Sequence, residues 1–385
     1  MKAAAMSNRQ SPIANRPIRL LTAVPICDGH DSAINTINLE FIRHGMEVIY
    51  LGYHRSARDI VRAAIQEDVR AIGISSYNGG HVEFFAEVLD LLKKNGAADI
   101  GVFGGGGGTI TSADAHAMEK KGVGRIFFPG TPLAEMVTFV REAYGRTRKG
   151  RLPKGTPNRR PSDYDLARWL TAAEAGSLQI ANHKSQIANL TVGVTGPGGA
   201  GKTTLIDELA LRFLKADGNA RLAILSHDPS LMGKGALLGD RATMIYSQDD
   251  RVFMRSLATR GQTGGLSQGT ARCLQLLKRS GFDLVLVETV GTGQEAMPFG
   301  RELADKTILV MSPDYGSRLQ LQKIVMLDAA DVVVVNKSDL AAAKTAAAEI
   351  EQRLALNQRG QKLISTVAKC HRDEGVDALF RLLFP

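Results

Sequence analysis

The sequence predicts an α/β protein with two doubly wound parallel-sheet domains, the first flavodoxin-like and the second of the P-loop type. The first observation is that short apolar runs alternate with amphipathic stretches of about 10 to 15 residues in both halves of the chain. The second is that residues 146–161 interrupt this alternation without any apolar periodicity. The third is a G-x-x-x-x-G-K-[ST] pattern that opens the second series.

The apolar runs divide the chain into four parts. We expect a flexible leader over 1–16, a first domain over 17–145, a basic linker over 146–162 and a second domain over 163–385. The expected strands of the first domain are 18–26, 46–53, 69–75, 100–106 and 125–128. Those of the second domain are 190–196, 221–228, 283–289, 306–313, 331–339 and 362–368. Ligands of such domains bind at the carboxyl ends of the strands.

Composition excludes several classes of protein. The 385 residues are 44% hydrophobic and 23% charged, which is typical of a globular protein and not of a disordered one. No apolar run approaches the roughly 20 residues of a membrane span, and the first residues lack the apolar core of a secretory signal. The three cysteines, Cys27, Cys273 and Cys370, are too far apart to indicate a disulfide framework or a zinc site. We therefore expect a cytoplasmic protein with no membrane partner.

The net charge of +9 raises the question of a nucleic-acid partner. Residues 146–161 hold seven basic residues and no acidic ones, so the rest of the chain sums to +9 − 7 = +2. The excess belongs to a connector, and we expect no nucleic-acid partner.

Residues 196–203 lie between an apolar strand and a helical run. Their glycines let backbone N–H groups wrap phosphates, Lys202 can reach the β- and γ-phosphate oxygens, and the Thr203 hydroxyl can hold Mg²⁺. A glycine turn without a ligand is the alternative, which the agreement of motif and context disfavours. The expected phosphate-binding residues are Gly196, Gly198, Gly199, Ala200, Gly201, Lys202, Thr203 and Thr204.

Acidic residues at other strand ends extend this site. Glu288 follows a buried strand, where its carboxylate can hold the magnesium shell while the Gly291 N–H senses the γ-phosphate. Asp228 and Asp240 flank a glycine-rich loop and can coordinate or order Mg²⁺, with a solvated turn as the alternative for each. Gln294 can orient the attacking water, although an exposed loop glutamine is an equal alternative. The expected catalytic residues are Lys202, Asp228, Glu288 and Gln294.

A second pattern favours guanine as the base. Asp339, which ends the N-K-x-D tetrapeptide begun by Asn336 and Lys337, can accept two N–H donors from guanine that adenine does not offer. A capping aspartate is the alternative, but the position after a phosphate loop favours GTP. Backbone N–H groups at Val367 and Ala368 follow the last strand and can reach the base oxygen.

The end of the first strand carries a candidate metal ligand. A lone histidine such as His30 more often has a structural role at a helix start. Asp28, however, can hydrogen-bond one ring nitrogen and leave the other aimed at a metal. Ser75 and Ser76 and the five glycines 104–108 end the third and fourth strands on the same edge. The glycines predict a slot for a bulky planar ligand with a tail, or else a glycine loop without a ligand.

These residues resemble the cobalamin-binding domain of adenosylcobalamin-dependent acyl-CoA mutases, with D-x-H at 28–30, the serine pair, the glycine run and P-G-T at 129–131. The resemblance implies that His30 is the lower axial ligand of cobalt and that Asp28 orients it. One departure is Ala33, which replaces the last glycine of D-x-H-x-x-G. The other expected cobalamin-binding residues are Ser75, Ser76, Gly104, Gly105, Gly106, Gly107, Pro129, Gly130 and Thr131.

The second half resembles the G-protein chaperones of methylmalonyl-CoA mutase, with GPGGAGKTT, DPS, GALLGDR, ETVGTGQ and NKSD all present. The domain order is similar to the N-terminal portion of the fused isobutyryl-CoA mutases, over about 17–145 and 190–385. The resemblance implies a Mg²⁺-dependent GTPase, with magnesium on Thr203, Asp228, Asp240 and Glu288, that gates adenosylcobalamin loading.

No acyl-CoA barrel follows in this sequence. Unless the sequence is part of a longer fusion, the resemblance therefore implies a separate large acyl-CoA-binding mutase subunit as partner. It also implies an adenosyltransferase as a further partner, and a homodimer or hetero-oligomer. One alternative is a cobalamin-sensing regulatory GTPase without a mutase partner. Another is a GTPase whose first half has lost its cofactor, for which Ala33 is the only hint.

Overall fold

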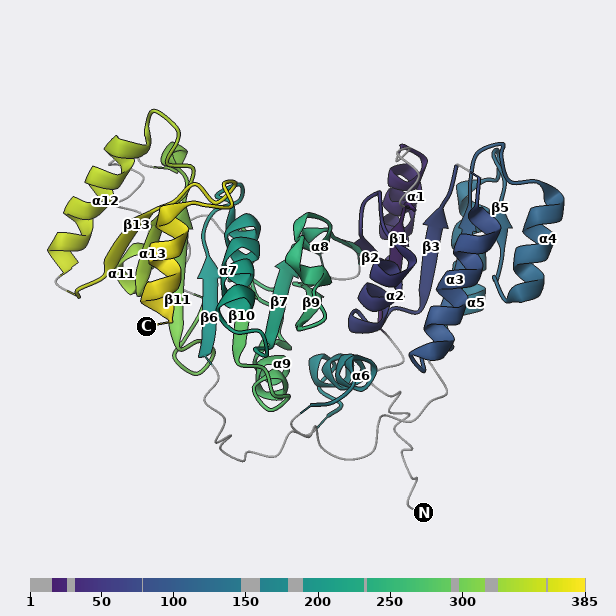
Figure 1. Cartoon of the computed structure of the whole chain (residues 1–385), viewed down its shortest axis with the longest axis horizontal. Coiled ribbons are helices and arrows are strands. Elements are labelled where there is room, and N and C mark those ends of the chain that lie inside the picture. The colour runs from purple at the N-terminus through teal and green to yellow at the C-terminus, as the bar shows by residue number, and fades with distance from the viewer. Residues whose placement is uncertain are drawn as a thin grey trace, which may run out of the picture.

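The computed structural model describes residues 16–25, 32–77, 79–146, 160–178, 190–231, 234–291, 298–315, 325–357 and 359–384. Two parallel sheets, each covered by helices, lie side by side in this part of the chain (Figure 1). They confirm the predicted α/β fold class. In Figure 1 the strands of both sheets point the same way, so the two carboxyl edges face one side of the molecule.

The first sheet has the order β5-β4-β3-β1-β2-β8, and all its pairings are parallel. Strand β1, the first in the described residues, lies inside the sheet, as expected for a doubly wound domain. The strands are β1 (Arg19–Ala23), β2 (Glu47–Tyr50), β3 (Ala71–Ser75), β4 (Gly101–Gly105), β5 (Ile126–Phe127) and β8 (Ala236–Leu238).

Helices cover both faces of this sheet because successive strand residues point to opposite sides. Leu20 packs with the face covered by α1 (Ser32–Arg43) and α5 (Leu133–Tyr144). Leu21 packs with the other face, under α2 (Ala57–Gln66), α3 (His81–Lys94) and α4 (Ser112–Lys121).

Local sequence explains where these helices begin. The Ser56 hydroxyl accepts the Asp59 N–H at 3.1 Å and so caps α2. Thr111 and Asp114 form a reciprocal capping box at the start of α4, and Gly122, with φ 118°, caps its C-terminal end.

The second sheet has the order β13-β12-β11-β6-β10-β7-β9 and is also parallel. Its strands are β6 (Leu190–Thr195), β7 (Leu222–Asp228), β9 (Val252–Ala258), β10 (Leu284–Glu288), β11 (Lys306–Met311), β12 (Val332–Val335) and β13 (Lys362–Ser365). The short helix α8 (Asp240–Thr243) and the 3₁₀ turns Tyr246–Gln248 and Pro313–Tyr315 lie in its connections.

Helices α7 (Lys202–Ala216) and α13 (Glu374–Leu383) pack on one face of the second sheet. The other face is covered by α6 (Asp163–Glu174) and α9 (Thr270–Leu277) over β7, β9 and β10, and by α11 (Val325–Ala329) and α12 (Ala343–Asn357) over β11 and β12.

Two strands were not predicted from the sequence. The run 252–258 is fully buried but contains Arg255 and Ser256, which interrupt its apolar pattern. Strand β8 has only three residues and belongs by sequence to the second half, yet it is the edge strand of the first sheet, paired to β2 through Val48 and Leu237.

A cluster of buried charges joins the two halves next to β8. We call it the interdomain charge cluster; it consists of Arg19, Glu47 and Glu67 from the first half and Glu174, Arg241, Arg255 and Arg260 from the second. At its centre is Glu67, which is fully buried. One carboxylate oxygen of Glu67 pairs with Arg19 at 2.8 Å and the other with Arg241 at 3.2 Å. Both also accept the backbone N–H of Ser256.

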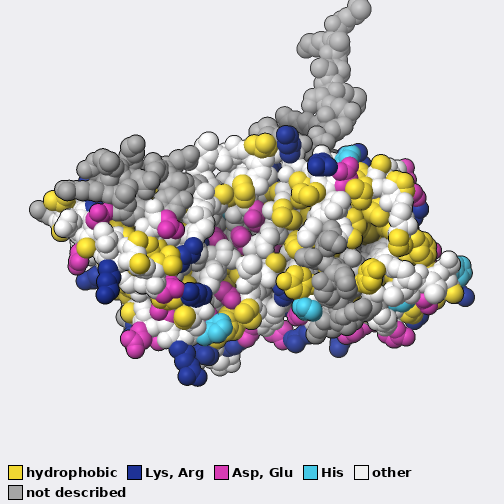
Figure 2. All heavy atoms as spheres, turned by 90° about the horizontal axis from the view of Figure 1, so that it is seen from above, with side chains coloured by type: hydrophobic (Ala, Val, Ile, Leu, Met, Phe, Trp, Pro, Cys, Tyr) yellow, Lys and Arg dark blue, Asp and Glu magenta, His cyan; other side chains and the backbone are white. Residues whose placement is uncertain are grey.

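Two features of the described residues concern membrane spans and surface charge. None of the helices found there is long and apolar enough to cross a membrane. On the face that carries the strand carboxyl ends, basic and acidic side chains are interspersed over both halves (Figure 2).

Glu67 provides a test of the interdomain charge cluster. Removing one partner of a buried ion pair leaves the others uncompensated, which costs about 3–5 kcal/mol. We expect Glu67→Gln to lower the free energy of unfolding by this amount. The measurement is urea denaturation followed by the fluorescence of Trp169, the only tryptophan, which is buried in α6. Glu87→Gln, on the exposed side of α3, is the matched control, and equal losses in the two variants would contradict the role of the cluster.

Candidate functional site

The phosphate loop lies between β6, near the middle of the second sheet, and the start of α7. Three of its glycines have positive φ, and a Cβ at Gly196 would lie 2.0 Å from the Val310 carbonyl oxygen. A Cβ at Gly201 would lie 2.3 Å from the Asn336 amide nitrogen. The glycines are thus required both by the backbone conformation and by close approach to neighbouring strands.

Lys202 is buried, and its ammonium donates to the carbonyl oxygens of Gly196 and Pro197 at 3.0 and 3.2 Å. Burial lowers the pKa of Lys202, while the carboxylates of Glu288 and Asp240 raise it. The ammonium therefore lies within the loop that is expected to hold phosphates.

The acidic residues predicted at the strand ends come together beside this loop. Glu288 ends β10 and accepts the Thr203 hydroxyl at 2.7 Å. Asp228 ends β7, and Asp240 begins α8 and accepts the Ser226 hydroxyl. Gly291 lies against the phosphate loop, since its Cβ would be 2.5 Å from the Cα of Gly198.

Burial and mutual repulsion make these carboxyls hard to ionise. Burial raises the pKa of Asp228 to about 9, with further contributions from Asp240 and Glu288. Burial and Asp240 raise the pKa of Glu288 to about 8, against the hydrogen bond from Thr203 and the charge of Lys202. The pKa of Asp240 is raised as well, mainly by burial.

Two of their oxygens fit a divalent cation. Asp228 Oδ2 and Glu288 Oε2 are buried and have no hydrogen-bond partner, although buried polar atoms are nearly always paired. In the described ranges, no three acidic, histidine or cysteine side chains converge as a complete metal cage. This arrangement suits Mg²⁺, which binds one or two protein carboxylates and keeps waters and substrate phosphates as its other ligands.

The residues predicted to bind the base lie at the ends of β12 and β13. Asn336 connects the phosphate loop to the base loop, because its amide donates to the Ala200 carbonyl at 2.9 Å and its oxygen accepts the Ala368 N–H at 3.0 Å. Lys337 has φ 59°, a left-handed conformation that is uncommon for a lysine.

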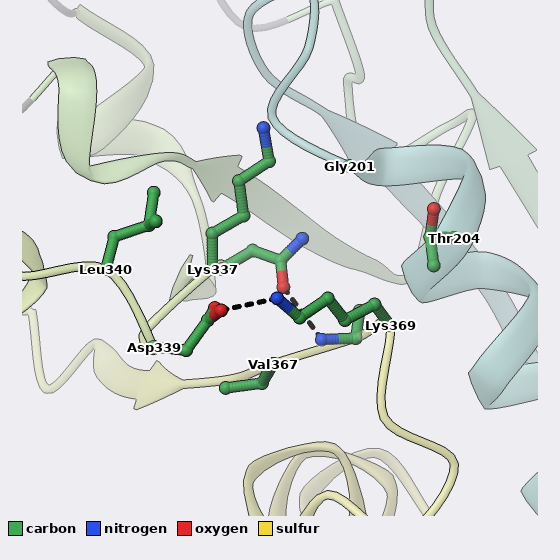
Figure 3. A pocket seen from close by; sticks show the side chains of 9 residues that line it. Gly201, Thr204, Lys337, Asp339, Leu340, Val367 and Lys369 are labelled. Carbon is green, nitrogen blue, oxygen red and sulfur yellow. Dashed lines mark hydrogen bonds and ion pairs between the residues drawn. The ribbon is translucent and has the colours of Figure 1, made fainter.

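A pocket of about 220 Å³ opens between these elements, and Asp339 and Lys369 point toward each other across it (Figure 3). Its lining includes both the phosphate-loop helix and the base loop: Gly201, Thr204, Asn336, Lys337, Asp339, Leu340, Val367, Ala368 and Lys369.

The first sheet brings the predicted cobalamin residues to its carboxyl edge. Ser75 ends β3 opposite Gly105 of β4, and the Ser76 N–H donates to the Gly105 carbonyl at 2.9 Å. Pro129, Gly130 and Thr131 form the turn after β5. Asp28, His30 and, in the second half, Gln294 lie outside the described residues.

The glycine run differs from the expected slot. Atoms of the protein itself occupy the Cβ positions of four glycines: Phe85 packs at Gly104, Phe127 at Gly105, Ser76 at Gly106 and Tyr77 at Gly107. Only Gly108 faces no atom within 4 Å. These glycines allow neighbouring elements to approach β4 closely, and of the five only Gly108 leaves open space for a Cβ.

Sequence reasoning missed three aromatic residues at this edge. Tyr53, Tyr77 and Phe128 follow β2, β3 and β5 and are 49%, 46% and 38% exposed. Hydrophobic side chains gather over this half of the molecule in Figure 2. An aromatic within three residues of a strand's carboxyl end in a doubly wound sheet was the available signal.

Comparisons with known proteins agree with this geometry. Residues 171–383 match the family model of the methylmalonyl-CoA mutase-associated GTPase MeaB. The chain belongs to this GTPase family. Residues 18–137 match the B12-binding domain, so the chain combines a cobalamin-binding domain with a MeaB-type GTPase domain.

Curated relatives combine the same two parts. The chain is 36% identical to the fused isobutyryl-CoA mutase of Geobacillus kaustophilus and 38% identical to that of Cupriavidus metallidurans. Each match covers 94% of this chain but only 36% and 35% of the relative, so the chain spans about a third of their length. It is also 36% identical to the mouse methylmalonic aciduria type A homolog, over 54% of this chain and 46% of that protein.

The raised pKa values predict a pH dependence of stability. These carboxyls lose their protons near pH 4 in the unfolded chain, whereas Asp228 and Glu288 hold theirs to about pH 9 and 8 in the folded protein. The folded protein therefore binds more protons over this range, and its stability falls as the pH rises.

Asp228→Asn removes one of the two carboxyls whose ionisation destabilises the folded protein at high pH. Without Mg²⁺, we expect the Tm of this variant to be close to that of the wild type at pH 5 and several degrees above it at pH 9, as measured by differential scanning fluorimetry. Asp90→Asn, at an exposed position of α3, is the control. Parallel Tm curves for wild type and Asp228→Asn would contradict the prediction.

Proposed function

We propose that this chain carries adenosylcobalamin for an acyl-CoA mutase and that GTP binding and hydrolysis in its second half gate the loading of that cofactor. The observation that supports gating most directly is β8. This strand lies in the segment that joins Asp228 to Asp240, the two acidic residues beside the phosphate loop, and it is also the edge strand of the cobalamin domain.

The second half has the groups that GTP hydrolysis needs. Lys202 and the backbone N–H groups of the phosphate loop neutralise charge on the phosphates while water attacks in line. Mg²⁺ would be held by Thr203 and Glu288, and Asp228 and Asp240 would order its water ligands. When bound, the ion offsets charge on the β- and γ-phosphates. Gln294 orients the attacking water in this proposal.

Guanine is the base that the pocket favours. The Asp339 carboxylate would accept the N1–H and N2–H donors of guanine. The Val367 N–H is the proposed donor to the base oxygen, because the Ala368 N–H already donates to Asn336 Oδ1. The Lys337 stem lines the same pocket, which supports a planar ligand at this place.

In the first half, His30 is the proposed axial ligand of cobalt and Asp28 fixes its ring. The residues at the ends of β3, β4 and β5 then lie beside the cofactor, and the exposed Tyr53, Tyr77 and Phe128 add apolar surface to the same edge. Adenosylcobalamin supplies radical chemistry to the mutase reaction.

Contacts before and after β8 in the chain link the nucleotide site to the first sheet. The Gly235 and Ala236 N–H groups donate to the carbonyls of Ile42 and Met46 at 3.1 and 3.2 Å. Directly after Asp240, Arg241 is fully buried against Glu67 of the cobalamin domain. A movement of Asp240 on binding Mg²⁺ and GTP would thus act on contacts with the first sheet.

The remaining parts of the proposal concern partners. A large acyl-CoA-binding mutase subunit or domain receives the cofactor, and an adenosyltransferase supplies it. The proposal further places the protein in the cytoplasm as a homodimer or hetero-oligomer.

The cofactor assignment has a direct spectroscopic test. On mixing the protein with adenosylcobalamin, we expect the absorption spectrum of the base-off, histidine-coordinated cofactor, and we expect His30→Ala to abolish it. His44→Ala, on a histidine just after α1, is the matched control and should keep the spectrum. An unchanged free-cofactor spectrum with the wild type would favour the alternative in which the first half has lost its cofactor.

Gating predicts a reciprocal effect between the two ligands. If a non-hydrolysable GTP analogue changes the affinity for adenosylcobalamin by some factor, the cofactor must change the affinity for the analogue by the same factor. We expect a factor of about 5 or more, typical of coupled sites, from titration calorimetry.

Gly235→Ala tests the role of β8 in this effect. A Cβ at Gly235 would lie 2.2 Å from the Met46 carbonyl oxygen, so the variant should push β8 away from the cobalamin domain. A Cβ at Gly239 meets nothing within 4 Å, which makes Gly239→Ala the matched control. We expect Gly235→Ala to bind both ligands independently and Gly239→Ala to keep the coupling. Independent binding in the wild type would contradict gating.

A further inference from the structure

We propose that Lys369 competes with guanine for the carboxylate of Asp339 and thereby lowers the affinity of the site for guanine nucleotides. The Lys369 ammonium nitrogen lies 2.5 Å from Asp339 Oδ2. The proposal rests on the proposed role of Asp339 in recognising guanine. It goes beyond that role because it assigns a function to a lysine outside the N-K-x-D tetrapeptide.

The competition follows from the position of the Lys369 ammonium on the carboxylate that guanine would use. An ionised carboxylate only accepts hydrogen bonds, and guanine offers two N–H donors to its two oxygens. The Lys369 ammonium is also a donor and already uses one of these oxygens. Both residues line the same pocket, and Figure 3 shows their side chains meeting across it. Each carboxylate oxygen has two lone pairs, so the two donors compete for space in the pocket and not for a lack of acceptor sites. Guanine therefore reaches both oxygens of Asp339 only after the lysine has moved away.

The backbone of Lys369 cannot move away easily, because the loop that carries it is anchored on both sides. On one side, the Ala368 N–H donates to Asn336 Oδ1 at 3.0 Å. On the other, the Arg212 guanidinium of α7 donates to the Asp373 carbonyl at 3.2 Å and to Asp377 at 2.6 Å. The side chain of Lys369 is thus the part that gives way, and it does so by rotating into solvent.

The pair is weak enough to break during binding. The side chains of Lys369 and Asp339 are 67% and 36% exposed, and exposed ion pairs contribute little in water. The hydrogen bond from Lys369 lowers the pKa of Asp339, so the carboxylate is ionised and competent for either donor at neutral pH. Lys369 therefore adjusts the affinity of the site and does not block it.

Lys369→Met tests the proposal because it keeps the apolar stem and removes the ammonium. We expect this variant to bind a fluorescently labelled GDP about two- to fivefold more tightly than the wild type at low ionic strength, the range that exposed ion pairs can supply. The gain should shrink at high salt, which screens the competing pair in the wild type. Lys369→Arg keeps a donor and should retain the wild-type Kd.

Lys344→Met, on the exposed surface of α12, is the control for loss of a positive charge elsewhere in the same domain. Weaker or unchanged GDP binding by Lys369→Met would overturn the proposal, as would equal gains in Lys369→Met and Lys344→Met. Wild-type Kd values for GDP and ADP distinguish a failure of the guanine assignment from a failure of the role of Lys369. If the wild type does not prefer GDP, the guanine assignment itself fails; if it does and Lys369→Met gains nothing, only the role of Lys369 fails.

Discussion

Burial of the Glu67 carboxylate is the constraint on which the relation between the two halves depends. Taking a carboxylate out of water costs several kcal/mol unless charged groups and hydrogen-bond donors replace the water. The first half supplies Arg19 as a partner, but Arg241 and the Ser256 N–H come from the second half. The cobalamin domain is therefore satisfied only while the GTPase domain is packed against it. This requirement fixes their relative position more strictly than a connector of any length can.

Polar groups of the nucleotide site also have protein partners that replace water. Lys202 donates to carbonyls of its own loop, Thr203 donates to Glu288, and Lys369 donates to Asp339. Ligand binding at such groups is an exchange of hydrogen-bond partners, so the net free energy is the difference between two sets of contacts. Asp228 Oδ2 and Glu288 Oε2 differ, because they are buried without any partner. A hydrated cation bound beside them would relieve an existing cost, and this is where we expect most of the favourable energy of metal binding.

Local patterns determined how much of this was predictable. Strands with uninterrupted apolar runs were predicted from the sequence. Strand β9 was missed because its pattern is interrupted by Arg255, a member of the interdomain charge cluster, and by Ser256, which donates to Glu67. Strand β8 was missed because its partner β2 lies almost 190 positions earlier, and no pattern within three residues records such a pairing.

The residues of the phosphate loop were predictable since their spacing is fixed by one turn. The glycines of β4 were found at the correct edge, but packing by Phe85 and Tyr77 could not be foreseen. Lys369 faces Asp339 only through the fold, from 30 positions away.

Strand β8 also has a protective role. A strand with unpaired N–H and C=O groups along one side is a template for pairing with other chains, and natural proteins cover such edges. In the first sheet that strand would be β2, whose outer side is occupied by β8 from the second half. Separating the two halves at the basic segment between them would leave β2 open to self-association and Glu47 without Arg260. The two domains thus differ in sequence family and in ligand, yet each depends on the other to stay soluble.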